Sequence, residues 1–394
     1  MNNTQQLNIE YFSLQSLFWM TYCMVVGFSV TYLLSCGYSN SEAGYILASA
    51  NICALILQPF FADLADRSKK INAMTIFLVS IEIIFVCSIG LFFIGVRSLI
   101  LTLIYVVMIT LANAVIAFLT SIQFLMDTSK SKINFGLCRA GGSLCFAILS
   151  ALMGIMIERI GMKSIPLALF IITLLMIGLC IFITRHSING NIKAVLTLEK
   201  KRSSSLFVFF NENPRFMILS IAMLFIYYAH AFITNFTISI VRNVGGDNRE
   251  MGYLIAFMAL MELPGMIGFK EISRRFKVSS LLLFSMIMFS IKAIIVWLSP
   301  SLMTLTFGFA LQVVSFAIYI PASVQYANII IDEKDTVKAQ MMFNLMQTGG
   351  AVFSSIIGGW LIDFSGISHA LLIGAILSCI GTIIAFAGIQ NTKR

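Results

Sequence analysis

Long apolar runs separated by short polar stretches dominate the pattern of hydrophobic and polar positions along this chain. Ile71–Gly95 and Leu99–Met126 are two of them, and each is long enough to cross a ~30 Å hydrocarbon layer as a helix. Tyr11–Leu34 has no basic segment before it, so we expect a retained first helix and not a cleaved signal peptide. The pattern predicts an all-α integral membrane protein with twelve spans, at residues 11–34, 42–62, 71–95, 99–126, 136–158, 165–184, 215–241, 250–270, 279–298, 302–331, 339–362 and 368–388.

The longest polar interruption, Arg185–Pro214, divides six spans from six. Short sequences recur between the halves at a common offset. Glu42–Ala48 resembles Glu250–Ala256, and Gly141-Gly142 recurs as Gly349-Gly350, in both cases 208 residues further along. The shared offset indicates a duplication, which predicts two six-helix bundles related by a pseudo-two-fold axis along the membrane normal. We expect the bundles at residues 1–184 and 215–394, with a cytoplasmic linker at 185–214. A duplication that only built a membrane scaffold is the alternative.

Composition agrees with a membrane environment, because only 11% of the residues are charged, against roughly a quarter in soluble domains. The net charge of +9 could suggest a nucleic-acid partner, but its distribution favours another origin. With both termini in the cytoplasm, the inner segments carry eighteen Lys and Arg residues and the outer loops carry five. This positive-inside bias predicts a multi-pass protein of the cell membrane with cytoplasmic termini and no nucleic-acid partner.

The loop after the second span resembles a known family signature. Ala62–Lys70 is similar to G-x-L-A-D-R-x-G-R-K of the major facilitator superfamily, although Ala62 and Lys69 replace its glycines. Its counterpart in the second half, Lys270–Lys277, is degenerate but follows the corresponding span. The resemblance implies the major facilitator fold and transport by alternating access. It also implies that the loop gates the cytoplasmic side, through Asp63, Asp66, Arg67 and Lys70.

Closer resemblance is to the branch of that superfamily that contains lactose permease and the phenylpropionate-permease-like proteins. The segments that carry it are Phe135–Ser143 with its Arg139, Met261–Pro264, Ser290–Ala293, Ser315–Tyr319 and Gly358–Asp363. Two departures affect the substrate. Ser121 replaces a fourth-span carboxylate of sugar recognition, and the tenth span has no charged residue before Asp332. Lactose is therefore not expected as the solute.

Ionisable side chains inside a bilayer are costly unless they face the protein interior or a cavity, so they are functional candidates. Glu262 lies about 18 Å from the outer end of its span at the rise of an α-helix. We expect Glu262 to be the proton-coupling carboxylate, Lys292 its switchable partner and His230 a further proton group. A static Glu262–Lys292 ion pair and a simply hydrogen-bonded His230 are the alternatives. Glu82 is expected to be structural.

Polar and aromatic residues recur at helical spacing on several spans, which is not typical of a lipid-facing surface. Their hydrogen-bonding groups and rings suit a neutral, hydroxyl-bearing solute such as a sugar or nucleoside. Polar contacts between helices are the alternative for any one of them, and snorkelling to the interface is the alternative for Arg139. The predicted solute-binding residues are Gln15, Trp19, Tyr22, Asn113, Gln123, Arg139, Tyr227, Gln312, Tyr319, Asn344 and Gln347.

The sequence contains no phosphate-binding Gly-rich loop, metal-spaced His/Cys cluster or soluble catalytic domain. We therefore expect neither an enzyme nor an ATP-driven pump, and no cofactor or metal. The leading hypothesis is a monomeric transporter that imports a small polar solute together with protons. Two alternatives remain open, which are a proton-coupled exporter of amphipathic compounds and a receptor or scaffold that has lost transport.

Overall fold

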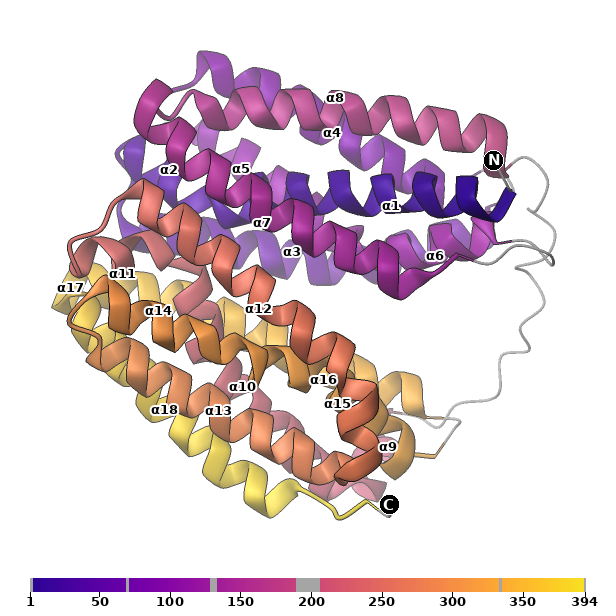
Figure 1. Ribbon diagram of the computed structural model, residues 1–394, viewed down its shortest axis with the longest axis vertical. Helices are drawn as coiled ribbons and strands as arrows, with labels where there is room; N and C mark the ends of the chain where they lie inside the picture. The colour runs from indigo at the N-terminus through magenta and orange to yellow at the C-terminus, as the bar shows by residue number, and fades with distance from the viewer. Residues whose placement is uncertain (1–2, 69–70, 128–132, 189–205, 333–334, 393–394) are drawn as a thin grey trace. The chain divides into compact units, whose positions relative to one another are not determined.

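The computed structural model describes residues 3–68, 71–127, 133–188, 206–332 and 335–392, and the part of the chain so described contains helices and no strand (Figure 1). The chain divides into two compact units, Met1–Leu198 (unit 1) and Glu199–Arg394 (unit 2). Within the range 185–214, which was expected as a linker, residues 189–205 lie outside the description. Helical turns flank them on both sides.

The elements of unit 1 are α1 (Asn3–Tyr22), η1 (Cys23–Gly27), α2 (Ser29–Ser35), α3 (Asn40–Arg67), α4 (Ala73–Phe93), α5 (Leu99–Ala114), α6 (Ile116–Met126), α7 (Phe135–Ile160), α8 (Ser164–Ile183) and η2 (Thr184–Ile188). In this unit α1 packs against α7 and α8, α3 against α5, and α4 against α8.

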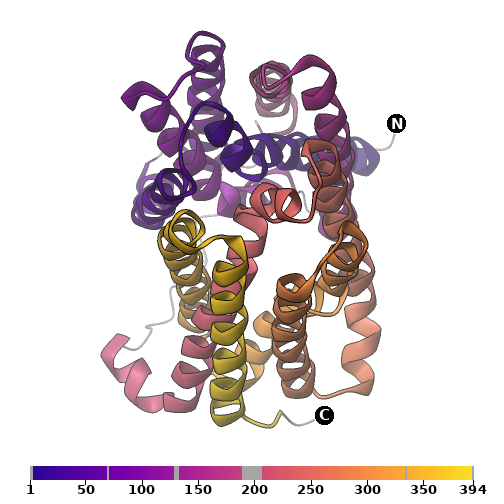
Figure 2. The same ribbon diagram turned by 90° about the vertical axis from the view of Figure 1, so that its left-hand side faces the viewer.

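The elements of unit 2 are α9 (Leu206–Glu212), α10 (Pro214–Asn235), α11 (Thr237–Asn243), α12 (Asn248–Arg275), α13 (Val278–Leu298), α14 (Leu302–Ala310), η4 (Leu311–Val313), α15 (Phe316–Ile330), α16 (Thr336–Phe353), η5 (Ser354–Gly358), α17 (Gly359–Ser365) and α18 (Ile367–Gly388). The last helix, α18, is yellow in Figures 1 and 2 and packs against α10 and α13.

Among the described residues, ten helices are long and apolar enough to cross a membrane, or up to twelve if each bent pair is one span. The bent pairs are the first span, with 41° between its two parts, and the fourth span, with 43° between α5 and α6. The predicted all-α membrane fold class is confirmed. The hydropathy pattern predicted these two spans as continuous, because a bend leaves the apolar composition of a helix unchanged.

The second span of each unit begins with the same cap. Ser39 and Glu42 form a capping box at the start of α3, and Asp247 and Glu250 form one at the start of α12. Each box satisfies two amide groups that the first turn of a helix leaves without partners. Both helices are 28 residues long. The Glu42–Ala48 sequence and its repeat therefore mark equivalent helix starts.

The repeated glycine pair marks a close helix crossing in each unit. A Cβ atom at Gly142 on α7 would lie 2.5 Å from the Trp19 ring on α1. One at Gly350 on α16 would lie 2.6 Å from the Leu224 carbonyl oxygen on α10. Only glycine permits these approaches, which bring the fifth span of each unit against its first.

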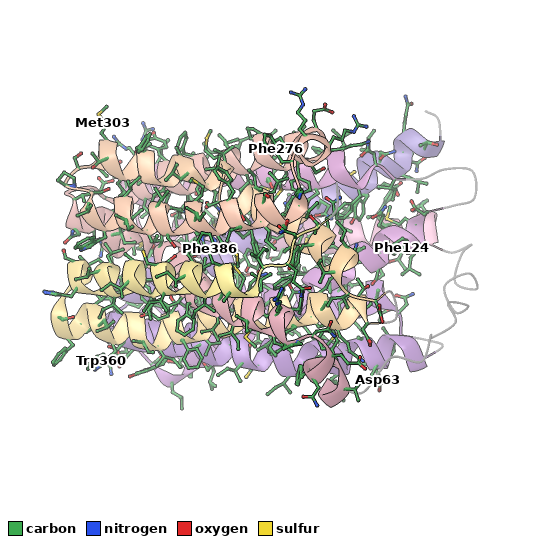
Figure 3. The ribbon with its side chains drawn as sticks, turned by 90° about the horizontal axis from the view of Figure 1, so that it is seen from below. Asp63, Phe124, Phe276, Met303, Trp360 and Phe386 are labelled. Atoms are coloured by element: carbon green, nitrogen blue, oxygen red, sulfur yellow. The ribbon has the colours of Figure 1, made fainter. Side chains whose placement is uncertain are left out.

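Many exposed side chains on the spans are apolar. Val86 on α4 is 65% exposed and Ile383 on α18 is 70% exposed. Exposed apolar side chains are costly in water and stable against lipid tails. In Figure 3, Asp63 and Phe124 lie at one end of unit 1, whereas Met303 and Trp360 lie at one end of unit 2, on opposite sides of it. These residues identify the ends of the antiparallel spans.

Candidate functional site

Three polar side chains from three elements of unit 2 form a hydrogen-bonded relay. The Lys292 ammonium on α13 donates to Oε1 of Gln312 in η4 at 2.6 Å. The Gln312 amino group donates to Oε1 of Glu262 on α12 at 2.9 Å. We call Lys292, Gln312 and Glu262 the relay. Both expected charged residues are therefore in one cluster, and Gln312, which was assigned to solute binding, lies between them.

Burial differs along the relay. Lys292 and Gln312 are each 1% exposed, whereas Glu262 is half-buried. The Lys292 ammonium also lies 4.0 Å from Sδ of Met258 and 5.6 Å from the centre of the Phe309 ring. His230 is near enough to interact with it electrostatically. These neighbours cannot neutralise an ammonium. The Glu262 carboxylate, reached through the amide, is the anion that offsets its charge.

The relay lies where span ten departs from regular α-helical geometry and α12 contains a proline. Span ten is interrupted by the 3₁₀ turn η4, which carries Gln312 between α14 and α15. On the facing helix, Pro264 lies two residues after Glu262 and cannot donate a helical hydrogen bond. Gly265 follows, where a Cβ atom would lie 2.5 Å from the Val313 carbonyl oxygen. This close packing holds the break in span ten against the turn of α12 that carries Glu262.

His230 on α10 lies in an aromatic cluster. Its ring stacks on Phe316 at 5.0 Å with an interplanar angle of 19°, and it contacts the edges of Tyr227 at 5.1 Å and Phe289 at 5.2 Å. The side chain is 6% exposed, and its Nδ1 has no hydrogen-bond partner among the described residues. Tyr319 is fully buried nearby on α15, where its ring contacts Phe289 and its hydroxyl accepts from Gln347 at 3.0 Å.

Four polar side chains form a chain of contacts along α1 and α7 in unit 1. The Arg139 guanidinium lies 4.0 Å from the centre of the Trp19 ring. The Trp19 indole donates to Gln15 at 3.0 Å, and the Gln15 amide donates to the Tyr11 hydroxyl at 2.8 Å. Three predicted solute-binding residues thus lie together. The Arg139 guanidinium therefore covers one face of the Trp19 ring.

A second polar group in unit 1 joins α1, α3 and α5. Tyr22 donates to the Asn113 side chain at 3.0 Å, and Asn113 donates to Asn51 at 3.0 Å. Gln58 donates to the Asn113 carbonyl oxygen at 3.1 Å. Sequence reasoning missed Asn51 and Gln58. Their spacing of seven residues on one helix, which places both on one face, was the available signal.

The remaining predicted residues lie apart from these clusters. Gln123 is half-buried on α6, and Asn344 is exposed on α16. Of the predicted gating residues, Asp63 is exposed near the end of α3. The side chains of Asp66 and Arg67, and Lys70 as a whole, lie outside the described residues. No group of three His, Cys, Asp or Glu side chains that could hold a metal ion is found in the described part of the chain.

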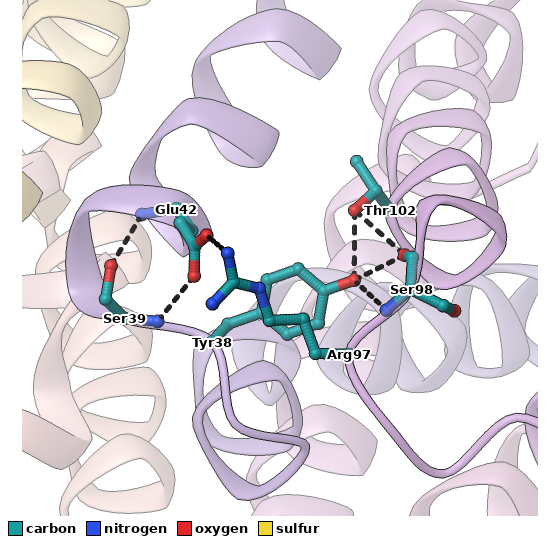
Figure 4. Close-up of polar contacts among 6 residues, drawn as sticks. All are labelled: Tyr38, Ser39, Glu42, Arg97, Ser98 and Thr102. Carbon is teal, nitrogen blue, oxygen red and sulfur yellow. Dashed lines mark hydrogen bonds and ion pairs between the residues drawn. The ribbon is translucent and has the colours of Figure 1, made fainter.

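The opposite end of α3 carries a polar cluster that sequence analysis did not identify (Figure 4). The Tyr38 hydroxyl donates to the Ser98 carbonyl oxygen at 2.7 Å and lies 2.9 Å from the Thr102 hydroxyl oxygen. Arg97 forms an ion pair with Glu42. A cavity of about 600 Å³ opens beside these side chains. The cluster fastens the loop before α3 to the loop before α5.

Comparison with known proteins agrees with this architecture. Residues 7–372 match the MFS_1 like family. The chain is 21% identical over 347 residues to a maltose permease of Geobacillus stearothermophilus, covering 88% of this chain and 85% of that protein. Its fold is similar to that of the nucleoside transporter NupG, with a TM-score of 0.78, 15% identity and 98% of both chains covered. A bacterial homolog of the human lysosomal transporter Spinster gives a TM-score of 0.71 at 12% identity, covering 98% of this chain and 97% of that one.

Proposed function

The chain belongs to the MFS_1 like family of membrane transporters, and we propose that it imports a small polar solute together with protons. Members of this group are carriers and not enzymes, so the solute crosses chemically unchanged. The relay carries the proposal, because it holds a half-buried carboxylate one amide away from a buried ammonium. Such a carboxylate can bind and release a proton. When it is protonated, the electrostatic attraction between it and the Lys292 ammonium is lost.

The proposed solute is a sugar or a nucleoside. Hydroxyl-bearing solutes need hydrogen-bonding groups and ring faces in one place, and unit 1 offers both around Trp19 and Asn113. One relative is named a maltose permease and one structural neighbour a nucleoside transporter. We assign the solute contacts of unit 1 to Trp19, Tyr22, Asn113 and Arg139. Gln15 is 1% exposed with both ends of its amide engaged, so we assign it to holding the Trp19 indole in place.

The proposed setting is the cell membrane, with both termini in the cytoplasm and one chain as the working unit. The eighteen inner and five outer basic residues support this orientation. In this setting the α3 end with Asp63 faces the cytoplasm, where we assign gating to Asp63, Asp66, Arg67 and Lys70. The cluster of Tyr38 and Arg97 then lies at the outer face.

The test is transport by Glu262→Gln in proteoliposomes loaded from a panel of sugars and nucleosides. A glutamine keeps the shape of Glu262 and an oxygen that can accept from Gln312, but it carries no charge and cannot exchange protons at neutral pH. Exchange of solute between the two sides should continue, whereas accumulation driven by an imposed pH difference should fall to the passive level. Glu158→Gln, an exposed change on α7, is the matched control and should accumulate solute normally.

Accumulation by Glu262→Gln against the solute gradient would refute proton coupling at this residue. A pH difference that drives amphipathic compounds out, and drives no panel solute in, would favour the exporter. A chain that moves nothing in either direction would favour a receptor or scaffold.

A further inference from the structure

Gln312 has a poor position for a solute-binding residue. Its side chain is 1% exposed, and both ends of its amide are engaged by ionisable groups. The orientation of the amide follows from those neighbours, since an ammonium has only donors and an ionised carboxylate only acceptors. Glu262, by contrast, is half-buried. Gln312 is therefore more fully enclosed than the carboxylate to which it donates.

The backbone at Gln312 is also the irregular part of its span. The Leu311 carbonyl oxygen accepts from the amides of both Val314 and Ser315, at 3.2 and 2.9 Å. Ser315 has φ −91° and ψ −89°, outside the α-helical region. A 3₁₀ stretch inside a long helix is typical of a hinge. Lys292, on the other side of the relay, lies within the uninterrupted helix α13.

We propose that Gln312 is a positioning residue that transmits the charge state of Glu262 to the break between α14 and α15, and that it does not bind the solute. The inference rests on the proposed coupling role of Glu262. A hydrogen bond to an ionised carboxylate is roughly twice as strong as one to its neutral form. Protonation of Glu262 therefore weakens its hydrogen bond with the Gln312 amino group. It also removes the negative charge that offsets the Lys292 ammonium.

The break is where this change can be accommodated. Lys292 is enclosed by Gln312, Met258 and Phe309, so a new environment for its ammonium requires one of those elements to move. Phe309 and Gln312 both lie on span ten, on either side of the junction of α14 and η4. Proton arrival at Glu262 is thereby converted into a change in the bend of span ten.

The test is a double-mutant cycle read by hydrogen–deuterium exchange of the segment Leu302–Ile330 in proteoliposomes, at one fixed pH. Glu262→Gln imitates the protonated carboxyl, and Gln312→Met removes the amide at similar volume. Each change should raise deuterium uptake around Leu311–Ser315, and the double variant should take up no more than either single variant. Gln340→Met is the matched control, since Gln340 donates to Asn328 on α15 at 3.1 Å outside the relay. It should leave uptake at the break unchanged.

Transport by Gln312→Met separates a positioning role from a binding role. We expect the solute concentration for half-maximal exchange to stay within twofold of the parent value, while pH-driven accumulation falls to the passive level. A weakened half-maximal concentration with accumulation retained would show that Gln312 binds solute and overturn the inference. Additive deuterium uptake in the double variant would also overturn it. Failure of the proposed coupling role of Glu262 is distinguishable from these outcomes, because the single variant Glu262→Gln would then still accumulate solute when a pH difference is imposed.

Discussion

Lys292 is the residue whose environment differs most from what its chemistry requires. Charged side chains are almost never fully buried unless they are paired. Lys292 is 1% exposed, and its ammonium donates to an amide oxygen and not to a carboxylate. Its compensation is indirect, through Gln312 to Glu262. The two ends of the relay therefore contribute unequally to stability, because Lys292 is enclosed whereas Glu262 is half-buried.

This asymmetry predicts the effect of removing each charge. Glu262→Leu should destabilise the fold by about 3–5 kcal/mol, since it leaves a buried ammonium without its anion. Lys292→Met should cost less, about 1–3 kcal/mol, because methionine refills the volume but leaves the buried Oε1 of Gln312 without its donor. The measurement is the reversible unfolding free energy in mixed micelles. The double variant should recover most of the unfolding free energy that Glu262→Leu loses. A larger loss for Lys292→Met than for Glu262→Leu would contradict this asymmetry.

The sequence identified both charges of the relay but not their link. A charge within an apolar run is visible from composition alone, because burying it is costly. Which amide side chain contacts that charge depends on how α12, α13 and span ten pack together. The residue spacing within a single span does not predict this packing. For the same reason Gln312 was grouped with solute-binding residues, and Asn51 and Gln58 were missed.

At the scale of elements, close backbone approach governs the site. Gly265 lies one turn after Glu262, and the break in span ten packs directly on it. Gly268 lies on the same helix, where a Cβ atom would meet only the end of the Ile272 side chain at 3.8 Å. The two glycines are therefore a matched pair that differs mainly in what lies opposite.

Gly265→Ala should push the Val313 carbonyl and the Ala317 side chain away from α12, because a Cβ atom would lie 2.5 Å from each. Such overpacking typically costs about 1–3 kcal/mol, and it should also slow solute exchange by displacing the relay. Gly268→Ala should be neutral or slightly stabilising, since alanine favours a helix by about 1 kcal/mol over glycine. The comparison is made by thermal unfolding and exchange rate. Equal effects of the two changes would show that the break does not depend on this contact.

Hydropathy predicted where the spans lie, but helix ends and bends have other causes. The second span was predicted to end at residue 62, whereas α3 continues to Arg67. The thickness of the hydrocarbon layer limits the length of the apolar run, whereas backbone hydrogen bonding determines where the helix ends. Here the helix continues past the apolar segment. Bends such as Cys23–Phe28 were not predicted, since a π-turn needs no change in composition.

At the scale of the whole molecule, the two units repeat the same order of elements, and a duplication explains this repetition. Each unit has a bent or divided first span, a 28-residue second span that begins with a capping box, an unbroken third span and an interrupted fourth span. The polar clusters do not repeat in the same way. Tyr38 and Arg97 stand in unit 1, whereas the relay stands in unit 2. A common scaffold therefore carries different chemistry in its two halves.

The orientation of this scaffold in the membrane can be tested on α12. Its 28 residues span about 42 Å at 1.5 Å per residue, so Arg242 before it and Lys277 after it should lie on opposite sides of a ~30 Å layer. Both residues are exposed. The excess of inner basic residues predicts that a membrane-impermeant maleimide added to intact cells labels Arg242→Cys and not Lys277→Cys. The unmodified chain, with its eight cysteines, gives the background, and permeabilised cells show that both sites react. Labelling of Lys277→Cys alone would invert the topology and place both termini outside.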